Sequence, residues 1–340
     1  MAKAVGCVSG GLDSMLAVRL VQRQGIDVLA LHALHLWHPN TPAPGEKPEA
    51  VRRTEALGAE VRTVDAAEAD LAMVRHPRFG LGKRMNPCID CRIWTLRQAK
   101  ALMEAEGAAF VFTGEVLGQR PMSQRRQVLQ LVAQEAGLED LLVRPLSARC
   151  LAPTRPERDG LLDRDHLCGF AGRSRKPQMA LAAELGITEY PTPAGGCLLT
   201  DPGFAHRLRE RMRATDVTPA DVELLKVGRH FRLDGGAWAV VGRHERDNLR
   251  LADLLQPGDV RLEAADLPGP TTVVRGAADA EALAQAAAIT LRYTRTPPGE
   301  VRDVTVQTVG DLPWTLRAAP ADEAFCREHL ITLGGSPRGQ

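Results

Sequence analysis

The chain has no apolar run that approaches the length of a membrane-spanning segment, so we expect no membrane partner. Its N-terminus has no charged-then-apolar signal pattern, and we therefore predict a cytoplasmic protein. Lys and Arg number 43 against 42 Asp and Glu, and the formal net charge of +1 does not indicate a nucleic-acid binder. Any surface that binds nucleic acid would have to be a local basic patch. We find no internal repeat and no low-complexity segment.

Aromatic residues are few, at 4% of the sequence, and the seven cysteines are an odd number. An odd count in a chain without a secretion signal argues against a disulfide framework and favours free thiols, metal binding or redox chemistry. Two common phosphate-binding patterns are also missing. The sequence has no Gly-Lys-Ser/Thr ending of a Walker loop and no G-x-G-x-x-G dinucleotide fingerprint. The 340 residues are nevertheless enough for two domains.

The most informative stretch is the hexapeptide Ser-Gly-Gly-Leu-Asp-Ser at residues 9–14. An apolar run typical of a buried strand precedes it and apolar residues at helical spacing follow it, so the order is strand, glycine turn, helix. The glycines let the backbone bend around an anion, the serines add hydroxyl donors, and the helix N-terminus attracts negative charge. We therefore predict a phosphate site made by Ser9, Gly10, Gly11, Asp13 and Ser14.

The first part of the chain alternates strand-like and helix-like patterns. Five strands are expected, at residues 4–8, 28–36, 61–64, 110–113 and 141–143. This order predicts the α/β class, with a doubly wound, mostly parallel sheet that binds a nucleotide at the carboxyl ends of its strands. The predicted nucleotide contacts at those ends are His32, Thr113, Gly114, Gln119 and Arg120.

Three histidines, His32, His35 and His38, lie close together in the sequence at the end of the second expected strand. Successive side chains of a strand point to opposite faces, so the three cannot easily converge on one metal ion. We interpret them as ordinary strand and rim histidines rather than as a metal cluster.

Three cysteines stand out by their surroundings. Cys88 and Cys91 form a C-x-x-C pair just before a helix expected at 92–106, and such a pair can bind a metal or form a redox couple. Cys197 lies in a loop at 190–202 that is rich in proline and glycine, which favours a ligand or a reactive thiol over a core residue. The other four cysteines have no partner at metal-binding spacing.

The composition changes near residue 215, where short strand-like segments replace the longer helical patterns. We expect a first domain at residues 1–214 and a smaller α+β domain at residues 215–340. The strands of the second domain are expected at 227–233, 237–241, 259–264, 271–275, 290–293 and 305–306.

The hexapeptide at residues 9–14 resembles the PP-loop of the ATP pyrophosphatase superfamily, whose fold is adenine nucleotide alpha hydrolase-like. Residues 1–213 are similar to tRNA thiolation enzymes, and look most like short archaeal-type 4-thiouridine synthetase-like proteins. The further stretches that carry this resemblance are Asn86–Cys91, 118–121, 172–175 and 193–197. The resemblance implies that ATP and Mg²⁺ bind at the loop, and that a uridine carbonyl of tRNA is adenylated before sulfur displaces AMP.

The resemblance also implies a [4Fe–4S] cluster held by Cys88, Cys91 and Cys197, with one iron left open to carry sulfur. Asp13 would be a catalytic residue that organises the Mg²⁺ or the loop. A rival chemistry uses no cluster: Cys91 and Cys197 are then catalytic, one carrying a persulfide and the other closing a disulfide on release. Structural zinc on the three thiols is a third hypothesis. The sulfur donor is expected to be sulfide or a persulfide carrier.

The C-terminal segments 240–248, 258–259 and 267–270 resemble the NFACT-type RNA-binding domain. Arg243, His244, Arg246 and Arg250 would form a basic edge for phosphate contacts. A small domain for oligomerisation or packing is the alternative, and a homodimer is one candidate assembly. Two other functions stay open at this point. One is an ATP-dependent ligase or amidase that acts on a small molecule, which leaves the three cysteines without a role. The other is an RNA-binding protein whose nucleotide site is only regulatory.

Overall fold

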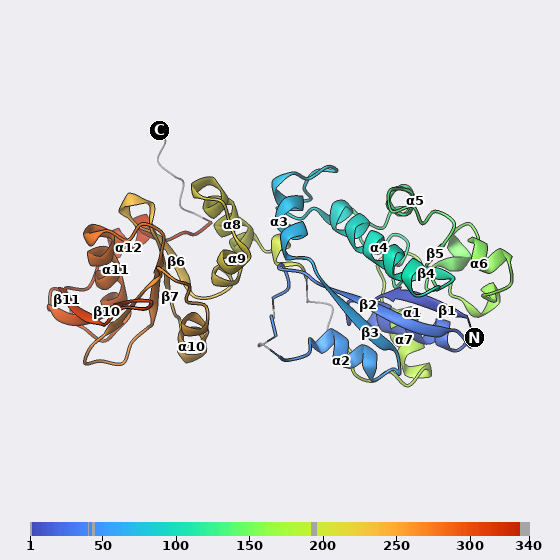
Figure 1. Ribbon diagram of the computed structural model, residues 1–340, viewed down its shortest axis with the longest axis horizontal. Helices are drawn as coiled ribbons and strands as arrows, with labels where there is room; N and C mark the ends of the chain where they lie inside the picture. The colour runs from blue at the N-terminus through green and yellow to red at the C-terminus, as the bar shows by residue number, and fades with distance from the viewer. Residues whose placement is uncertain (1, 40, 43–44, 192–195, 334–340) are drawn as a thin grey trace. The chain divides into compact units, whose positions relative to one another are not determined.

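The computed structural model describes residues 2–39, 41–42, 45–191 and 196–333. The chain divides into two compact units, Met1–Thr200 and Asp201–Gln340, which we name unit 1 and unit 2 (Figure 1). The division lies ahead of helix α8 (Pro202–Ala214), which the sequence analysis assigns to the first domain. Helix α8 packs against α9 (Pro219–Leu225), and for this reason it is grouped with unit 2.

Unit 1 contains a five-stranded sheet, ordered β3-β2-β1-β4-β5, in which every neighbouring pair is parallel. Its strands are β1 (Lys3–Cys7), β2 (Asp27–Leu34), β3 (Glu60–Asp65), β4 (Phe110–Thr113) and β5 (Leu142–Val143). The central strand β1 is apolar because both of its faces are covered, and Ala4 and Val5 are fully buried. The strand order reverses between β1 and β4, which confirms the predicted doubly wound α/β fold.

Helices cover both faces of this sheet. They are α1 (Leu12–Gln22), α2 (Glu49–Glu55), α3 (Ala67–Arg75), α4 (Cys88–Ala105), α5 (Arg126–Glu135), α6 (Arg155–Arg158) and α7 (Lys176–Glu184). The apolar side chains of α1 pack with Phe110 and Phe112 on one face. Those of α4 pack with Val5 and Val111 on the other face, and α5 lies beside α4 (Figure 1). The loops that follow β1, β2 and β4 therefore meet at the carboxyl edge of the sheet.

Helix α4 begins at Cys88, earlier than the helix expected at 92–106. The prediction that both cysteines precede this helix is therefore wrong, because Cys88 and Cys91 occupy its first turn. No residue between them opposes a helix, and the acidic Asp90 favours one through the helix dipole. Residues three apart share one face of a helix, so the two sulfurs project to the same side.

Unit 2 is built on a six-stranded antiparallel sheet with the order β11-β10-β8-β9-β7-β6. Its strands are β6 (Arg229–Arg232), β7 (Trp238–Val241), β8 (Val260–Ala264), β9 (Thr272–Arg275), β10 (Arg302–Thr308) and β11 (Trp314–Ala318). Besides α8 and α9, its helices are α10 (Glu245–Asp253), α11 (Ala280–Arg292) and α12 (Glu323–His329). Helix α11 packs on the sheet and supplies much of the core, which confirms the predicted α+β class. None of the described helices is both long and apolar enough to cross a bilayer.

The strand expected at 290–293 is wrong, because those residues form the end of helix α11 and its cap. The β-branched Ile289 and Thr290 suggested a strand, but the residues before them are rich in alanine, the strongest helix former. Asp279 caps this helix by accepting a hydrogen bond from the Ala282 N–H at 2.8 Å. The helical preference of the whole segment thus outweighs the strand preference of its last turn.

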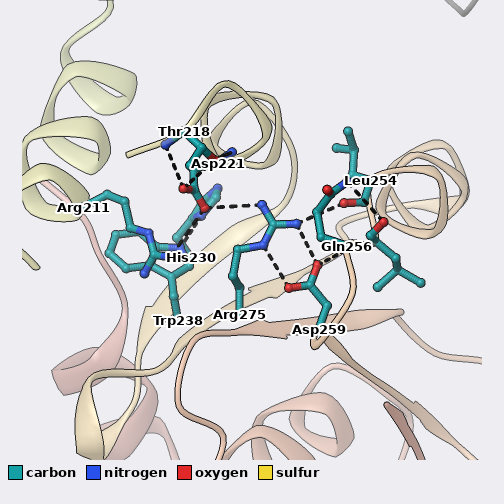
Figure 2. Close-up of polar contacts among 10 residues, drawn as sticks. Arg211, Thr218, Asp221, His230, Trp238, Leu254, Gln256, Asp259 and Arg275 are labelled. Carbon is teal, nitrogen blue, oxygen red and sulfur yellow. Dashed lines mark hydrogen bonds and ion pairs between the residues drawn. The ribbon is translucent and has the colours of Figure 1, made fainter. Parts of the chain in front are cut away.

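A buried ion cluster connects the sheet of unit 2 to the loops around it (Figure 2). Arg275, at the end of β9, donates to both carboxylate oxygens of Asp259, at 2.9 and 2.7 Å. The same guanidinium lies 3.3 Å from Asp221 of α9, whose other oxygen accepts hydrogen bonds from Thr218. The Arg275 side chain is only 11% exposed, so water screens these charges weakly.

We expect Arg275→Met to lower the free energy of unfolding by about 3–5 kcal/mol, because it leaves the buried Asp259 without its counter-charge and leaves Asp221 with Arg211 alone. Urea denaturation of the full chain measures the loss. Arg327→Ala is the matched control, since its ion pair with Glu323 is 78% and 73% exposed and should contribute little. Equal midpoints for Arg275→Met and the wild type would contradict this account of the cluster.

His230 on β6 gives unit 2 a dependence on pH. Its Nδ1 accepts a hydrogen bond from Trp238 Nε1 at 3.0 Å (Figure 2), and burial, followed by the charge of Arg207, lowers the pKa of His230 well below its usual value. The unfolded chain takes up a proton near pH 6.5 that the folded chain does not, so stability falls from pH 7 to pH 5, by up to about 1.4 kcal/mol per pH unit. We expect His230→Asn to show a smaller loss than the wild type in denaturation at both pH values; an unchanged loss would assign the effect to other groups.

Candidate active site

The loop at residues 9–14 forms a glycine turn between β1 and α1. Gly10 adopts a φ of +69°, and a side chain there would meet the Ala50 Cα at 2.5 Å, so only glycine fits. The Ser14 hydroxyl donates to the Gly11 carbonyl at 2.8 Å and so fixes the end of the turn. No side chain of the described residues caps α1, which leaves the N-terminus of this helix able to face an anion.

Asp13, in the first turn of α1, has one carboxylate oxygen in use and one without a partner. Its Oδ2 accepts a hydrogen bond from Gln119 Nε2 at 3.0 Å, whereas Oδ1 is buried and has no hydrogen-bond partner among the described residues. Burial raises the pKa of Asp13, and the Gln119 hydrogen bond and the charges of Arg175 and Arg120 act against this rise. A buried, unpartnered carboxylate oxygen fits a hard cation such as Mg²⁺.

Two further loops approach Asp13. The loop after β4 touches the start of α1, because a side chain on Gly114 would meet the Asp13 carbonyl oxygen at 2.5 Å. The same loop pairs with the arginine-containing segment 172–175, where the Gly172 N–H donates to the Leu117 carbonyl at 2.7 Å. Residues far apart in the sequence are thus brought beside the phosphate loop, as the predicted sheet requires.

Two of the expected nucleotide contacts have partners within the protein. His32 Nδ1 lies 2.9 Å from the Val8 carbonyl oxygen, and burial lowers the pKa of this histidine. The Thr113 hydroxyl donates to Glu115 at 3.2 Å, and Glu115 pairs with the buried Arg144 at 2.9 Å. These contacts fix both side chains at the sheet edge, and their contact with a nucleotide stays a prediction.

Cys88 and Cys91 are presented by the tight turn that precedes α4. The Gly82 N–H donates to the Asn86 carbonyl at 2.9 Å, and a side chain on Gly82 would meet the Asn86 amide at 2.4 Å. This turn directs Asn86 Nδ2 to the Cys88 sulfur, at 3.2 Å. The two sulfurs therefore have different surroundings, because the Asn86 amide donates a hydrogen bond to Cys88.

Two backbone hydrogen bonds bring the third cysteine to the same place. The Leu198 N–H, next to Cys197, donates to the Trp37 carbonyl at 2.8 Å, just after β2. The Met85 N–H donates to the Leu199 carbonyl at 3.3 Å, which joins the Cys197 loop to the turn before α4. Segments from three parts of the sequence therefore lie side by side.

The charges that act on Cys197 include those of the other two thiols. Burial raises the pKa of Cys197 to about 12, and Cys91, Cys88 and Asp70 are near enough to raise it further. The Cys197 residue is exposed to solvent. The residues 193–195 of the loop motif lie outside the described residues.

His35 completes this group, and the sequence analysis did not predict it. Its Nε2 lies 3.7 Å from the Cys91 sulfur, and its Nδ1 lies 2.9 Å from Asp70 Oδ1. Burial lowers the pKa of His35, but the hydrogen bonds to Asp70 and Cys91 and their charges outweigh it and raise the pKa to about 10. The signal available in the sequence was the place of His35 near the carboxyl end of the strand expected at 28–36, where ligands bind to such a sheet.

No three His, Cys, Asp or Glu side chains in the described parts of the chain are grouped to hold one metal ion. Structural zinc on the three thiols stays a hypothesis. A [4Fe–4S] cluster has a thiolate on each ligated iron, so its ligands lie further apart than those of a single ion. Three neighbouring thiols fit such a cluster in kind and number, and the role of Cys88, Cys91 and Cys197 as its ligands stays a prediction.

The expected basic edge of unit 2 is partly neutralised within the protein. Arg243 pairs with Asp247 at 2.7 Å, and Arg250 pairs with Glu223 at 3.3 Å. His244 caps α10, since its Nδ1 accepts a hydrogen bond from the Asp247 N–H at 3.2 Å. An RNA phosphate at this edge would share these side chains with their carboxylate partners.

Two family models match the chain. Residues 1–149 match the model described as thiamine biosynthesis protein (ThiI), and residues 228–328 match the NFACT protein RNA binding domain. These two ranges lie in unit 1 and unit 2, respectively.

Curated relatives are similar to shorter or longer parts of the chain. The tRNA-specific 2-thiouridylase MnmA of Nitratidesulfovibrio vulgaris is 33% identical over 143 residues, which cover 39% of this chain and 40% of that protein. A probable tRNA sulfurtransferase of Methanothermobacter thermautotrophicus is 31% identical over 34% of this chain and 30% of its own length. The MnmA of Salinispora arenicola is 25% identical over 83% of this chain and 77% of its own length. The chain thus spans well under half the length of two of these relatives.

Among solved structures, a 4-thiouridine synthetase–RNA complex with bound ATP aligns with a TM-score of 0.37 and 18% identity, over 66% of this chain and 52% of that one. The U34-tRNA thiolase NcsA from Methanococcus maripaludis with its [4Fe-4S] cluster aligns with a TM-score of 0.30 and 15% identity, over 64% of this chain and 73% of that one.

Proposed function

We propose that the chain is an ATP-dependent tRNA sulfurtransferase, because residues 1–149 match the ThiI family model and residues 228–328 match the model of the NFACT protein RNA binding domain. The reaction class is the one named for its relatives, which act as tRNA-specific 2-thiouridylases and probable tRNA sulfurtransferases. The proposal gives each half of the chain a role: unit 1 activates the base and transfers sulfur, and unit 2 contributes to RNA binding.

One observation carries this proposal: the phosphate loop and the three thiols lie at the same edge of one sheet. The loop follows the carboxyl end of β1, and His35, which contacts Cys91, follows the carboxyl end of β2. In the strand order of unit 1, β1 and β2 are hydrogen-bonded neighbours. A base activated at the loop therefore has a short path to a sulfur held at the cysteines.

The first step is activation of the uridine by ATP. The glycine turn and the open N-terminus of α1 bind the phosphates, and the free oxygen of Asp13 would hold a Mg²⁺ that neutralises part of their charge. The uridine carbonyl oxygen attacks the α-phosphorus, pyrophosphate leaves, and the base becomes an adenylate. Its carbon then has AMP as a good leaving group.

The second step replaces AMP by sulfur at the same carbon. Cys88, Cys91 and Cys197 would hold a [4Fe–4S] cluster, which when bound would supply the sulfur nucleophile. The chain's own part is to present three cysteine sulfurs, two from the first turn of α4 and one from the loop that contains Cys197, and to keep them near the glycine turn at residues 9–14. The turn before α4 and the contact of Leu198 with Trp37 supply that placement.

Pyrophosphate release with and without tRNA tests the proposal against its alternatives. We expect release from ATP only when unmodified tRNA is present, because the base is the acceptor of AMP. Release without RNA, dependent on a small acid, would support the ligase instead. No release under either condition, with retained RNA binding, would identify a nucleotide-regulated RNA-binding protein.

A further inference from the structure

The two cysteines of the C-x-x-C pair have different hydrogen-bond partners. The Cys88 sulfur lies 3.2 Å from a neutral amide, Asn86 Nδ2, whereas the Cys91 sulfur lies 3.7 Å from the imidazole Nε2 of His35. Hydrogen bonds to sulfur are longer than those to oxygen, because the sulfur atom is large. The first turn of α4 thus presents two chemically unequal sulfurs.

The imidazole that faces Cys91 is held by a buried carboxylate. Asp70, on α3, is 1% exposed and accepts from His35 Nδ1–H at 2.9 Å. Its second oxygen accepts from the Leu36 N–H at 2.8 Å, which fixes the carboxylate to the backbone beside His35. Because Nδ1 is bound by Asp70, the ring can turn only its Nε2 edge toward the sulfur.

We propose that His35, oriented by Asp70, is a positioning residue that hydrogen-bonds the Cys91 sulfur and makes it functionally distinct from the Cys88 sulfur. Its role in catalysis rests on the proposed function, in which Cys91 handles sulfur. The hydrogen bond itself is a property of the folded chain and can be measured without tRNA. It joins α3, the end of β2 and α4 into one supporting structure.

The His35–Asp70 pair would affect Cys91 whether the cysteines hold a cluster or are free of metal. Outer hydrogen bonds fix the orientation of metal ligands, and those to cluster sulfurs set the reduction potential. A cysteine without metal is affected as well, because a hydrogen bond to the charged form of sulfur favours that form and raises its reactivity. Asn86 gives Cys88 a weaker, neutral donor.

Alkylation of the full-length, iron-free chain by limiting iodoacetamide measures this difference directly. Tryptic cleavage after Arg84 and Arg92 leaves Cys88 and Cys91 on one peptide, so fragment masses give the ratio of the two modifications within one sample. We expect His35→Gln to lower the ratio of Cys91 to Cys88 alkylation about tenfold, as for loss of a charge-assisted hydrogen bond. Asp70→Asn should shift the ratio in the same direction. His38→Gln, an exposed histidine close by, is the matched control and should leave the ratio unchanged.

The outcomes separate this inference from the function on which it rests. An unchanged ratio in His35→Gln, with wild-type melting behaviour, would overturn it even if tRNA thiolation is demonstrated. A lowered ratio would support it even if tRNA proves not to be the substrate. In anaerobically purified protein that contains iron, His35→Gln should also move the reduction potential to a more negative value, and an identical potential would argue against a hydrogen bond to the ligand sulfur.

Discussion

Asp13→Asn is expected to lower tRNA-dependent pyrophosphate release by on the order of a hundredfold, with the fold of unit 1 unchanged. The reason is that the two carboxylate oxygens of Asp13 have different surroundings. Gln119 occupies Oδ2, and Oδ1 is buried without a protein partner, which fits a bound cation. An amide at this position keeps the shape of the side chain and removes the charge that holds the cation near the phosphates.

The measurement is a coupled pyrophosphate assay at saturating ATP over a range of Mg²⁺ concentrations. Raising Mg²⁺ should restore part of the lost rate, because the variant binds the cation more weakly. Asp27→Asn, at the exposed start of β2, is the control and should retain full activity. Full release by Asp13→Asn at low Mg²⁺ would remove Asp13 from the nucleotide site.

Cys197→Ser should separate the two steps of the reaction. We expect sulfur transfer to fall by more than about a hundredfold, since even a lost outer-shell partner of a metal ligand costs 10–100-fold. Pyrophosphate release should stay within about threefold of the wild type, because a serine preserves the size of the side chain and leaves the phosphate loop untouched. Serine is a poor ligand for iron and a poor sulfur carrier.

Thiolated nucleosides and pyrophosphate are measured in the same reaction with this variant. Cys150→Ser is the matched control, since its sulfur lies 3.3 Å from the Gly169 carbonyl and a hydroxyl can keep that hydrogen bond. Cys197→Ser should lose iron in anaerobic preparations if the cluster chemistry holds, and should keep its metal content if the persulfide chemistry holds. Normal thiolation by Cys197→Ser would refute both.

The glycine turn at residues 9–14 could be predicted from the sequence because its determinants are local. A glycine turn between an apolar strand and a helix is set by neighbouring residues, and Gly10 shows this, with its positive φ and its close approach to Ala50. The parallel sheet follows from the alternation of strands and helices. These features need no knowledge of distant contacts.

The His35–Asp70–Cys91 contact could not be predicted in the same way. Its three residues come from the end of β2, from α3 and from α4, and only the folded chain brings them together. The short helix α3 has a weak apolar pattern, and the sequence analysis assigned no element to it. The sequence analysis rejected a three-histidine metal site because strand side chains alternate, but β2 ends at Leu34, so His35 and His38 follow the strand and the alternation does not apply to them. The same argument set aside His35, which contacts Cys91.

Mass spectrometry of tRNA nucleosides from cells with and without this gene tests the central claim most directly. The account predicts that one thiolated uridine disappears from the deletion strain and returns with the wild-type gene but not with Cys197→Ser. Unchanged thiouridine content in the deletion strain, with the remaining thiolation enzymes accounted for, would contradict it.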